Sequence, residues 1–180
     1  EQVLEPRNDY EGERSLFSVI WGGLANFSYR LAPGHKLSLN GIYNQTAEDE
    51  ARTLDGFDAD QGTDVRTTRL RFVERSLFSA QLIGEHQLPF LFGSQLDWRG
   101  AYSRAGRDEP DNRETAYVFD PGTGRFVFRP ITQSGSRFFS FLDDDDWSGA
   151  LDWTIPFSQW SSLPARLKVG GLAQLKQRDF

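Results

Sequence analysis

Six long segments of alternating apolar and polar residues, joined by connections that are short and long in turn, constrain the fold of this chain most. The segments cover residues 15–31, 36–50, 65–86, 94–106, 144–157 and 165–178. Between them, residues 51–64 and 107–143 form long polar connections, and the other three connections are short. This rhythm predicts an antiparallel up-and-down sheet, with tight turns at one end and long outer loops at the other.

Each segment separates into an apolar and a polar face when every second residue is taken, because successive side chains of a strand point to opposite faces. In segment 144–157, for example, Trp147, Leu151 and Trp153 oppose Asp152 and Thr154. The first segment is less regular, since its upper half is apolar on both faces. The alternation therefore favours strands almost everywhere and disfavours helices.

The length of the segments distinguishes between two all-β folds. Soluble strands usually have about 3–10 residues, and a transmembrane β-strand needs about 9–11 alternating residues. No stretch approaches the roughly 18 apolar residues of a transmembrane helix. We therefore predict an antiparallel up-and-down meander of about six long strands, as part of a larger transmembrane β-barrel. A soluble meander is the alternative, because it also has one apolar and one polar face.

A transmembrane barrel cannot be closed by six strands, because about eight is the lower limit. Open sheet edges in lipid would leave unpaired backbone groups, each costing several kcal/mol. We therefore expect residues 1–180 to form a partial barrel. The remaining strands are expected elsewhere in the same polypeptide or in further copies of it.

Composition excludes several classes of function. The formal net charge of −6 argues against nucleic acid as a partner. The absence of Cys excludes a disulfide scaffold and thiolate metal sites. With only His35 and His86 as histidines, no catalytic constellation is visible, so we do not expect an enzyme. Aromatic residues make up 14% of the chain, which suits both membrane-interface girdles and a sugar-binding surface.

Several runs carry a family resemblance. Residues Glu74–His86, Trp98–Arg113 and Asp146–Phe157 resemble the barrel of TonB-dependent outer-membrane receptors, and Leu167–Phe180 is similar to a strand of the same barrels. The resemblance implies a 22-stranded barrel in the lipid of the bacterial outer membrane, filled by an N-terminal plug. It also implies uptake of scarce ligands such as iron chelates, vitamin B12 or glycans, driven by an inner-membrane energy-coupling complex. Residues 1–180 contain no recognisable plug, energy-coupling box or last strand of that family.

Ligand binding and uptake across the outer membrane is thus the function that the resemblance implies. Two other classes remain open. One is a structural or adhesive surface barrel without transport, which would use the aromatic loop 117–141 as a platform for a partner. The other is a soluble β-sandwich that binds carbohydrate through exposed Trp residues and acidic loops.

Charged residues on the predicted polar face are the first ligand-binding candidates. Arg69, Arg71 and Arg99 lie on this face together with Asp97. They would line the lumen and contact an anionic ligand or the plug. The interpretation that we prefer is a ladder of cross-strand ion pairs, each worth about 0.2–1 kcal/mol.

Aromatic residues of the long outer loop are the second set of candidates, namely Phe126, Phe128, Phe138 and Phe139. Apolar residues at every second position in 117–119 and 126–128 predict a hairpin, turned by Asp120-Pro-Gly-Thr-Gly124. These rings would form a capture surface for a ligand or partner, or would pack on one another.

The acidic run Asp143, Asp144, Asp145 and Asp146 is the weakest candidate site. Hard cations such as calcium take six to eight oxygen ligands. A solvated strand end with like charges explains the run as well. Apart from this calcium candidate, no cofactor is expected.

Overall fold

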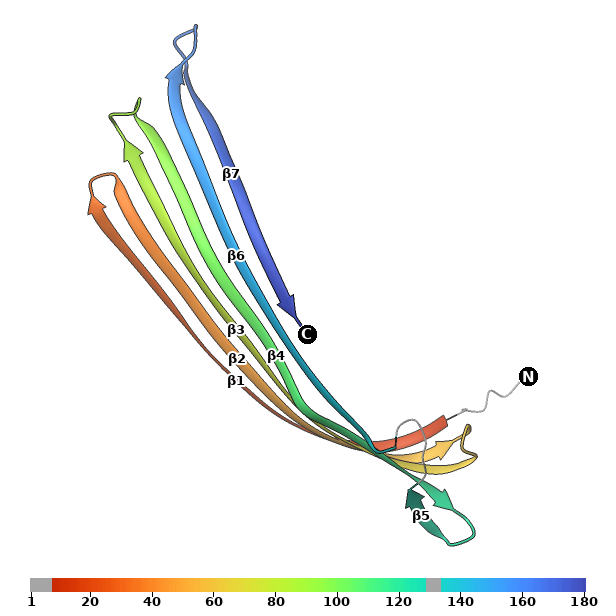
Figure 1. Ribbon diagram of the computed structural model, residues 1–180. Coiled ribbons are helices and arrows are strands. Elements are labelled where there is room, and N and C mark those ends of the chain that lie inside the picture. Colours follow the sequence, from red (N-terminus) through yellow and green to blue (C-terminus); the bar gives the residue numbers. More distant parts are fainter. Residues whose placement is uncertain (1–7, 129–133) are drawn as a thin grey trace. The chain divides into compact units, whose positions relative to one another are not determined.

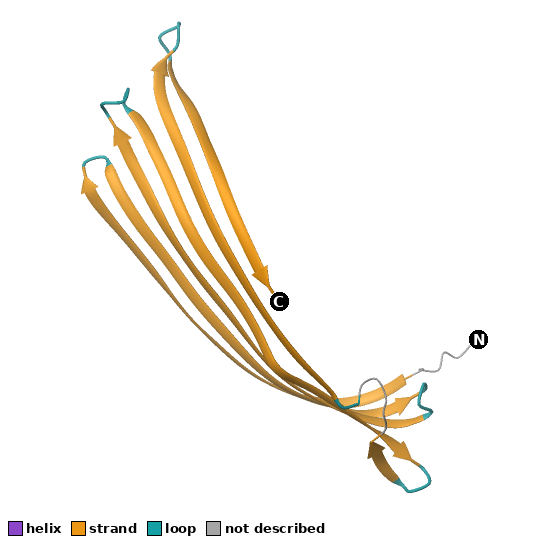
Figure 2. Cartoon of the chain, viewed as in Figure 1, coloured by secondary structure: helices purple, strands orange, loops and turns teal. Residues whose placement is uncertain are grey.

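The structure, a computed structural model, describes residues 8–128 and 134–180. These residues form strands β1 (Asn8–Ala32), β2 (His35–Asp58), β3 (Thr63–Leu88), β4 (Ser94–Asp120), β5 (Arg125–Phe128), β6 (Ser136–Ser158) and β7 (Pro164–Asp179) (Figure 1). Figure 2 shows strands and connecting turns throughout the described ranges. No helix in these ranges is long and apolar enough to cross a lipid bilayer.

All seven strands belong to one sheet, with the order β1-β2-β3-β4-β6-β7 and with β5 paired to β4. Consecutive long strands are therefore neighbours, which confirms the predicted all-β, antiparallel up-and-down meander of six long strands. The sheet is open, and β1 and β7 lie at its two edges. The predicted short connections are also in place, since the sheet turns at residues 33–34, 89–93 and 159–163.

The prediction of a long loop at 51–64 was wrong. β2 continues to Asp58, and β3 begins at Thr63, so only a short turn remains between them. Asp58 closes this turn, because its Oδ1 accepts hydrogen bonds from the backbone N–H groups of Asp60 and Gln61 at 2.8 and 3.2 Å. Polar side chains also bind the two strands together, as in the 2.6 Å contact between Arg66 Nε and Asp55 Oδ1.

Most of the predicted loop 107–143 is strand as well. β4 runs on to Asp120, and β6 begins at Ser136, whereas residues 129–133 lie outside the described residues. The predicted hairpin within this region is confirmed. Its register pairs residue 117 with 128 and 119 with 126. Gly124 ends the turn with φ +64°, a conformation that glycine adopts without steric cost.

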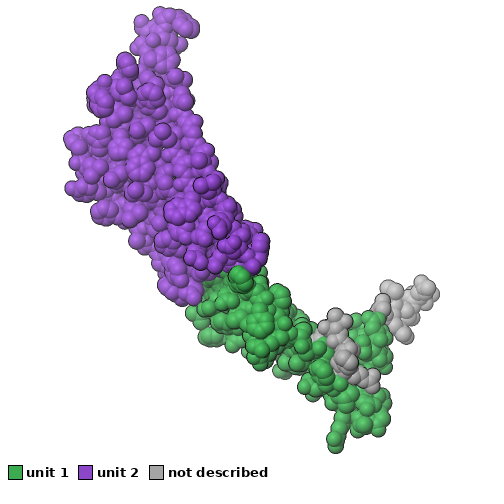
Figure 3. Space-filling view, viewed as in Figure 1, with its two compact units in different colours: residues 1–20, 46–75, 107–141 green, residues 21–45, 76–106, 142–180 purple. Residues whose placement is uncertain are grey.

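The chain divides into two compact units (Figure 3). Unit 1 comprises residues 1–20, 46–75 and 107–141, and unit 2 comprises residues 21–45, 76–106 and 142–180.

The hydrophobic core is small and belongs to unit 1, where Val65, Ala116 and Val118 are buried against one another. Among the described residues of unit 2, no hydrophobic side chain is fully buried. Its apolar side chains lie on an uncovered sheet face, which a folded protein must cover with lipid, another layer of protein, or a partner.

The register of β6 and β7 fixes the two faces of unit 2. Trp153 pairs with Val169 and Ile155 with Leu167 on one face, whereas Thr154 pairs with Lys168 on the other. From the Trp147–Leu175 pair to the Phe157–Ala165 pair, every second pair is apolar on both strands. The other face is mostly polar, although the apolar pair of Ala150 and Leu172 lies on it. The faces predicted from alternation in these two strands are confirmed.

Candidate functional site

Five aromatic side chains of unit 2, which we call the aromatic belt, come one from each of β1, β2, β3, β4 and β6. They are Trp21, Tyr43, Phe78, Tyr102 and Trp147. The ring centroids of Trp21 and Tyr43 are 5.0 Å apart, those of Phe78 and Tyr102 are 6.1 Å apart, and those of Tyr102 and Trp147 are 4.3 Å apart. The belt crosses the strands on the apolar face, because Trp147 lies opposite Leu175 in the β6–β7 register.

The strand segments between the aromatic belt and the short turns have nearly equal lengths. They are 21–31, 35–43, 78–88, 94–102 and 147–157. Each contains about 9–11 residues, which is the length that a tilted strand needs to cross the hydrocarbon core of a bilayer. Unit 2 therefore carries an apolar band of membrane-spanning length, with aromatic residues at one border.

On the polar face of unit 2, an open hollow of about 490 Å³ brings together two predicted site residues, Asp97 and Arg99. Glu85, Gln95 and Asp152 also line it. Gln95 Nε2 donates to both carboxylate oxygens of Asp97, at 2.9 and 3.1 Å. Asp152 lies 3.4 Å from Lys168 Nζ. This hollow offers amide, carboxylate and guanidinium groups to a polar ligand or to another protein segment.

Near the short turns of unit 2, two histidines and a tryptophan form a chain of hydrogen bonds that sequence reasoning missed. Trp98 Nε1 donates to His86 Nε2 at 3.0 Å, and His86 Nδ1 lies 3.0 Å from His35 Nδ1. Because His86 Nε2 accepts, the proton of a neutral His86 must reside on Nδ1, from which it is donated to His35. Cross-strand pairing creates this chain, and no spacing in the sequence indicates it.

The acidic run 143–146 does not converge on one point. Its four carboxylates contact different partners: Asp143 contacts Arg104, Asp144 contacts Lys176 and Arg178, Asp145 contacts Tyr102, and Asp146 contacts Gln174. Within the described ranges, no group of three or more His, Cys, Asp or Glu side chains could hold a metal ion. The calcium hypothesis therefore gains no support from the geometry.

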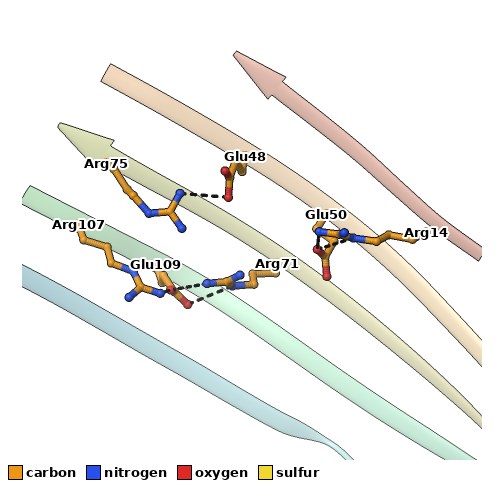
Figure 4. A network of polar contacts seen from close by, with 7 residues as sticks. All are labelled: Arg14, Glu48, Glu50, Arg71, Arg75, Arg107 and Glu109. Atoms are coloured by element: carbon orange, nitrogen blue, oxygen red, sulfur yellow. Dashed lines mark hydrogen bonds and ion pairs between the residues drawn. The ribbon is translucent and has the colours of Figure 1, made fainter. Parts of the chain in front are cut away.

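Unit 1 carries a network of arginines and carboxylates on one face, which we call the arginine face (Figure 4). Arg71 Nη2 lies 2.9 Å from Glu109 Oε1, and Arg107 contacts the same carboxylate. Arg14 donates to Glu50 from β1, and Arg75 Nη1 lies 3.1 Å from Glu48 Oε2. Asp111 continues this face of β4 and contacts Arg113 and Arg137.

The arginines shift the ionisation of the carboxylates that they contact. The hydrogen bond from Arg71 lowers the pKa of Glu109, and the hydrogen bond from Arg14 lowers that of Glu50. Hydrogen bonds from Arg113 and Arg137 lower the pKa of Asp111 to about 2. These carboxylates therefore stay charged at neutral pH and neutralise part of the arginine face.

The structure separates the predicted arginines into different environments. Arg71 is ion-paired, as the ladder interpretation requires, whereas the Nε atom of Arg69 is buried without a hydrogen-bond partner among the described residues. Arg99 lies in the hollow of unit 2. The predicted basic set is thus divided between two units and forms no single site.

The predicted aromatic candidates also divide. In the β4–β5 hairpin, the ring centroids of Phe126 and Phe119 are 5.5 Å apart, and the Arg66 guanidinium lies 4.7 Å from the centre of the Phe126 ring. Phe128 packs edge-on against Tyr117. Phe138 and Phe139 lie at the start of β6 and are exposed, with Arg137 over the Phe139 ring at 4.9 Å. The hairpin rings therefore pack on one another, although Phe128 stays as exposed as the rings of Phe138 and Phe139 in β6.

Sequence comparison adds no assignment to this geometry. No protein-family model and no curated protein matches the chain.

Proposed function

We propose that unit 2 is part of the wall of an outer-membrane β-barrel, and that the whole barrel binds a ligand and takes it up as TonB-dependent receptors do. The observation that carries this proposal is the aromatic belt together with the apolar band of about 9–11 residues between it and the short turns. Trp and Tyr side chains gather at membrane–water interfaces, where their rings meet lipid and their polar groups meet water.

The absence of a core among the described residues of unit 2 supports the same proposal. Leu151 and Val169 of the apolar face are at least half exposed, although they lie within long strands. Lipid would cover such a face without a second protein layer. A soluble sandwich would instead need a second sheet of matching length, packed about 10 Å away.

The open edges of the sheet indicate that the barrel contains further strands. β1 and β7 are edge strands, and their unpaired backbone groups would each cost several kcal/mol in hydrocarbon. Further strands are therefore required on both sides. In the family that the sequence resembles, these strands belong to the same polypeptide as the plug, and an inner-membrane complex supplies the energy for uptake.

A pair of matched variants tests the membrane placement. Leu151→Arg puts a charge on the apolar face near the middle of the band, whereas Ala150→Arg puts the same charge one residue away on the polar face, beside Asp152. We expect Leu151→Arg to reduce insertion into lipid vesicles by about 2–4 kcal/mol, the cost of Arg at the bilayer midplane. Ala150→Arg should insert almost normally. Equal insertion of both variants would refute the placement.

A second experiment tests uptake. Cells that carry the native polypeptide should accumulate its ligand only while the inner membrane is energised. Surface binding that persists without any accumulation would instead favour an adhesive barrel. The exposed rings of Phe138, Phe139 and Phe141 are the observation that supports that second candidate, since they offer an uncovered apolar surface in unit 1.

A further inference from the structure

Arg52 lies two residues from Glu50 on β2, and Arg69 lies two residues from Arg71 on β3, so both belong to the arginine face. They lie beside one another across the strand pair. Arg66 and Asp55 are in contact at 2.6 Å. Because β2 and β3 are antiparallel, moving three residues along each strand from this contact brings Arg52 level with Arg69. Both positive charges also lower the pKa of Glu50, which indicates that both guanidinium groups lie near that carboxylate.

Neither arginine has a carboxylate of its own. Glu50 accepts hydrogen bonds from Arg14 Nε and Nη2, at 2.8 and 2.5 Å, so its charge is already shared with β1. Arg52 and Arg69 form no ion pair with any described residue, and Arg69 Nε is buried without a partner. Like charges opposite one another destabilise a strand pair, and so does a buried donor without an acceptor.

The imbalance extends over the whole arginine face. Eight guanidinium groups share it: Arg14, Arg52, Arg69, Arg71, Arg75, Arg107, Arg113 and Arg137. The ion pairs described above bring four carboxylates to them, namely Glu48, Glu50, Glu109 and Asp111. This local excess of positive charge stands out in a chain whose formal net charge is −6.

The residue type defines the chemistry that would relieve this imbalance. All three lysines of the chain, Lys36, Lys168 and Lys176, belong to unit 2, so unit 1 carries its positive charge on arginine alone. The planar guanidinium fork matches the geometry of carboxylate and phosphate groups and binds them through two parallel hydrogen bonds. Two adjacent forks can therefore hold one oxyanion between them.

We propose that Arg52 and Arg69 form a binding site for an oxyanion group, a carboxylate or a phosphate, carried by the ligand of this protein. Arg52 and Arg69 each supply a guanidinium fork to the oxyanion. The neighbouring ion pairs, such as Arg71 with Glu109, hold the remaining guanidinium groups in place around the site. Anion binding stands without the membrane placement, and only its role in uptake rests on the proposed function.

The test compares two double variants that lose the same charge. Arg52→Gln/Arg69→Gln removes the proposed site. Arg66→Gln/Arg125→Gln removes two arginines that take no part in the pairs of the arginine face, since Arg66 pairs with Asp55 and Arg125 lies in the hairpin. The native polypeptide that contains this chain is purified in detergent. Binding of inorganic phosphate and of citrate is then measured by calorimetry and by thermal shift, at constant ionic strength with chloride as the reference.

We expect phosphate or citrate to raise the melting temperature of the wild type, because a ligand that binds only the folded state stabilises it. The Arg52/Arg69 variant should bind at least about tenfold more weakly, as loss of charge-assisted hydrogen bonds predicts. The Arg66/Arg125 variant should stay within about twofold of the wild type. Without either anion, the Arg52/Arg69 variant should melt no lower than the wild type, because it loses a like-charge contact.

Three outcomes would overturn the inference: no response of the wild type to either anion, equal weakening in both double variants, or full binding by the Arg52/Arg69 variant. A response to phosphate alone or to citrate alone identifies the oxyanion group. Lipid insertion is measured separately with the Leu151 variant. If the wild type inserts normally but binds neither anion, this inference fails and the proposed function stands. If it binds an anion but Leu151→Arg inserts as well as Ala150→Arg, the membrane placement fails and the anion site stands.

Discussion

Arg71 Nη2 lies 2.9 Å from Glu109 Oε1, and this ion pair joins β3 to β4 around a carboxylate whose side chain is only 4% exposed. Arg107 contacts the same carboxylate from two residues away on β4. One buried acid thus contacts two guanidinium groups and balances the charge of one of them. Removal of either partner from such a pair leaves an uncompensated charge, which costs more free energy than the loss of an exposed pair.

We therefore predict that Glu109→Gln lowers the free energy of unfolding by about 1–3 kcal/mol, because Arg71 and Arg107 both lose their carboxylate. Arg71→Gln should cost less, since Glu109 keeps Arg107. Urea unfolding in detergent measures both changes. The Asp55–Arg66 pair is the control, because both side chains are about half exposed and the coupling of such pairs is typically about 0.2–1 kcal/mol. If the Arg71–Glu109 pair had the same coupling energy as the Asp55–Arg66 pair, burial of Glu109 would not strengthen its ion pair.

The arginine face should also make unit 1 sensitive to acid. Asp111 titrates in the folded state with a pKa of about 2, because Arg113 and Arg137 donate hydrogen bonds to its charged form. Its pKa in the unfolded chain is about 4. The lowered folded-state pKa means that the stabilisation is fully present above about pH 4 and is lost as the pH falls towards 2.

Carbon NMR titration of the Asp111 carboxylate tests this prediction directly. Arg137→Gln removes one of its two donors, so the pKa of Asp111 should rise towards its ordinary value, and the acid-induced loss of stability should begin at a higher pH. Arg66→Gln should leave the titration unchanged, since Arg66 contacts Asp55 instead. An unperturbed Asp111 titration in the wild type would show that these ion pairs do not persist in solution.

Alternation in the sequence was sufficient to predict the parts of the sheet that have one apolar face. The hairpin of residues 117–119 with 126–128 was predicted together with its turn, because Asp-Pro-Gly between two alternating runs is a strong local signal. The faces of β6 and β7 were predicted for the same reason. Both signals are local, so they can be recognised in the sequence without knowing which strands are neighbours.

Alternation was not sufficient where both faces of a strand are polar. In β2, the predicted strand ended at residue 50, because Arg52, Asp55 and Asp58 place polar side chains on both faces of residues 51–58, which resemble a loop in sequence. The ion pair of Asp55 with Arg66 of β3 and the hydrogen bond from the Tyr10 hydroxyl of β1 to Asp58 hold this part as a strand. Such pairs depend on cross-strand register, which a single sequence does not reveal.

The same limit applies to the candidate site. Arg69 and Arg71 were selected from the sequence, but Arg52 was not, because nothing in its own segment marks it. Its significance comes from Arg69 on the next strand. The aromatic belt was missed as a unit for the same reason, although each strand contributes one ring that the sequence shows plainly.

A third prediction concerns the hydrogen-bonded chain of Trp98, His86 and His35. Because Trp98 Nε1 donates to His86 Nε2, neutral His86 should carry its proton on Nδ1, which nitrogen NMR of the imidazole resolves. Trp98→Phe keeps an aromatic ring but removes the donor, so the preference for this tautomer should weaken. The loss should cost about 0.5–1.5 kcal/mol of stability. Trp160→Phe is the control, since Trp160 is 98% exposed, and it should change neither quantity.

The last prediction concerns the turn that carries the β4–β5 hairpin. Gly124 has φ +64°, and Asp120 holds the turn by accepting hydrogen bonds from the Gly122 N–H and the Thr123 hydroxyl, both at 3.0 Å. A side chain in this left-handed conformation costs about 1–2 kcal/mol, so Gly124→Ala should open the hairpin more often. Amide hydrogen exchange in β5 should then accelerate by about five- to thirtyfold, because each 1.4 kcal/mol changes an equilibrium tenfold. Gly100→Ala is the control, because a methyl group there would meet no atom within 4 Å. If exchange in β5 were unchanged in Gly124→Ala, the hairpin would have to turn through a different conformation, and the pairing of Phe119 with Phe126 would have to be revised.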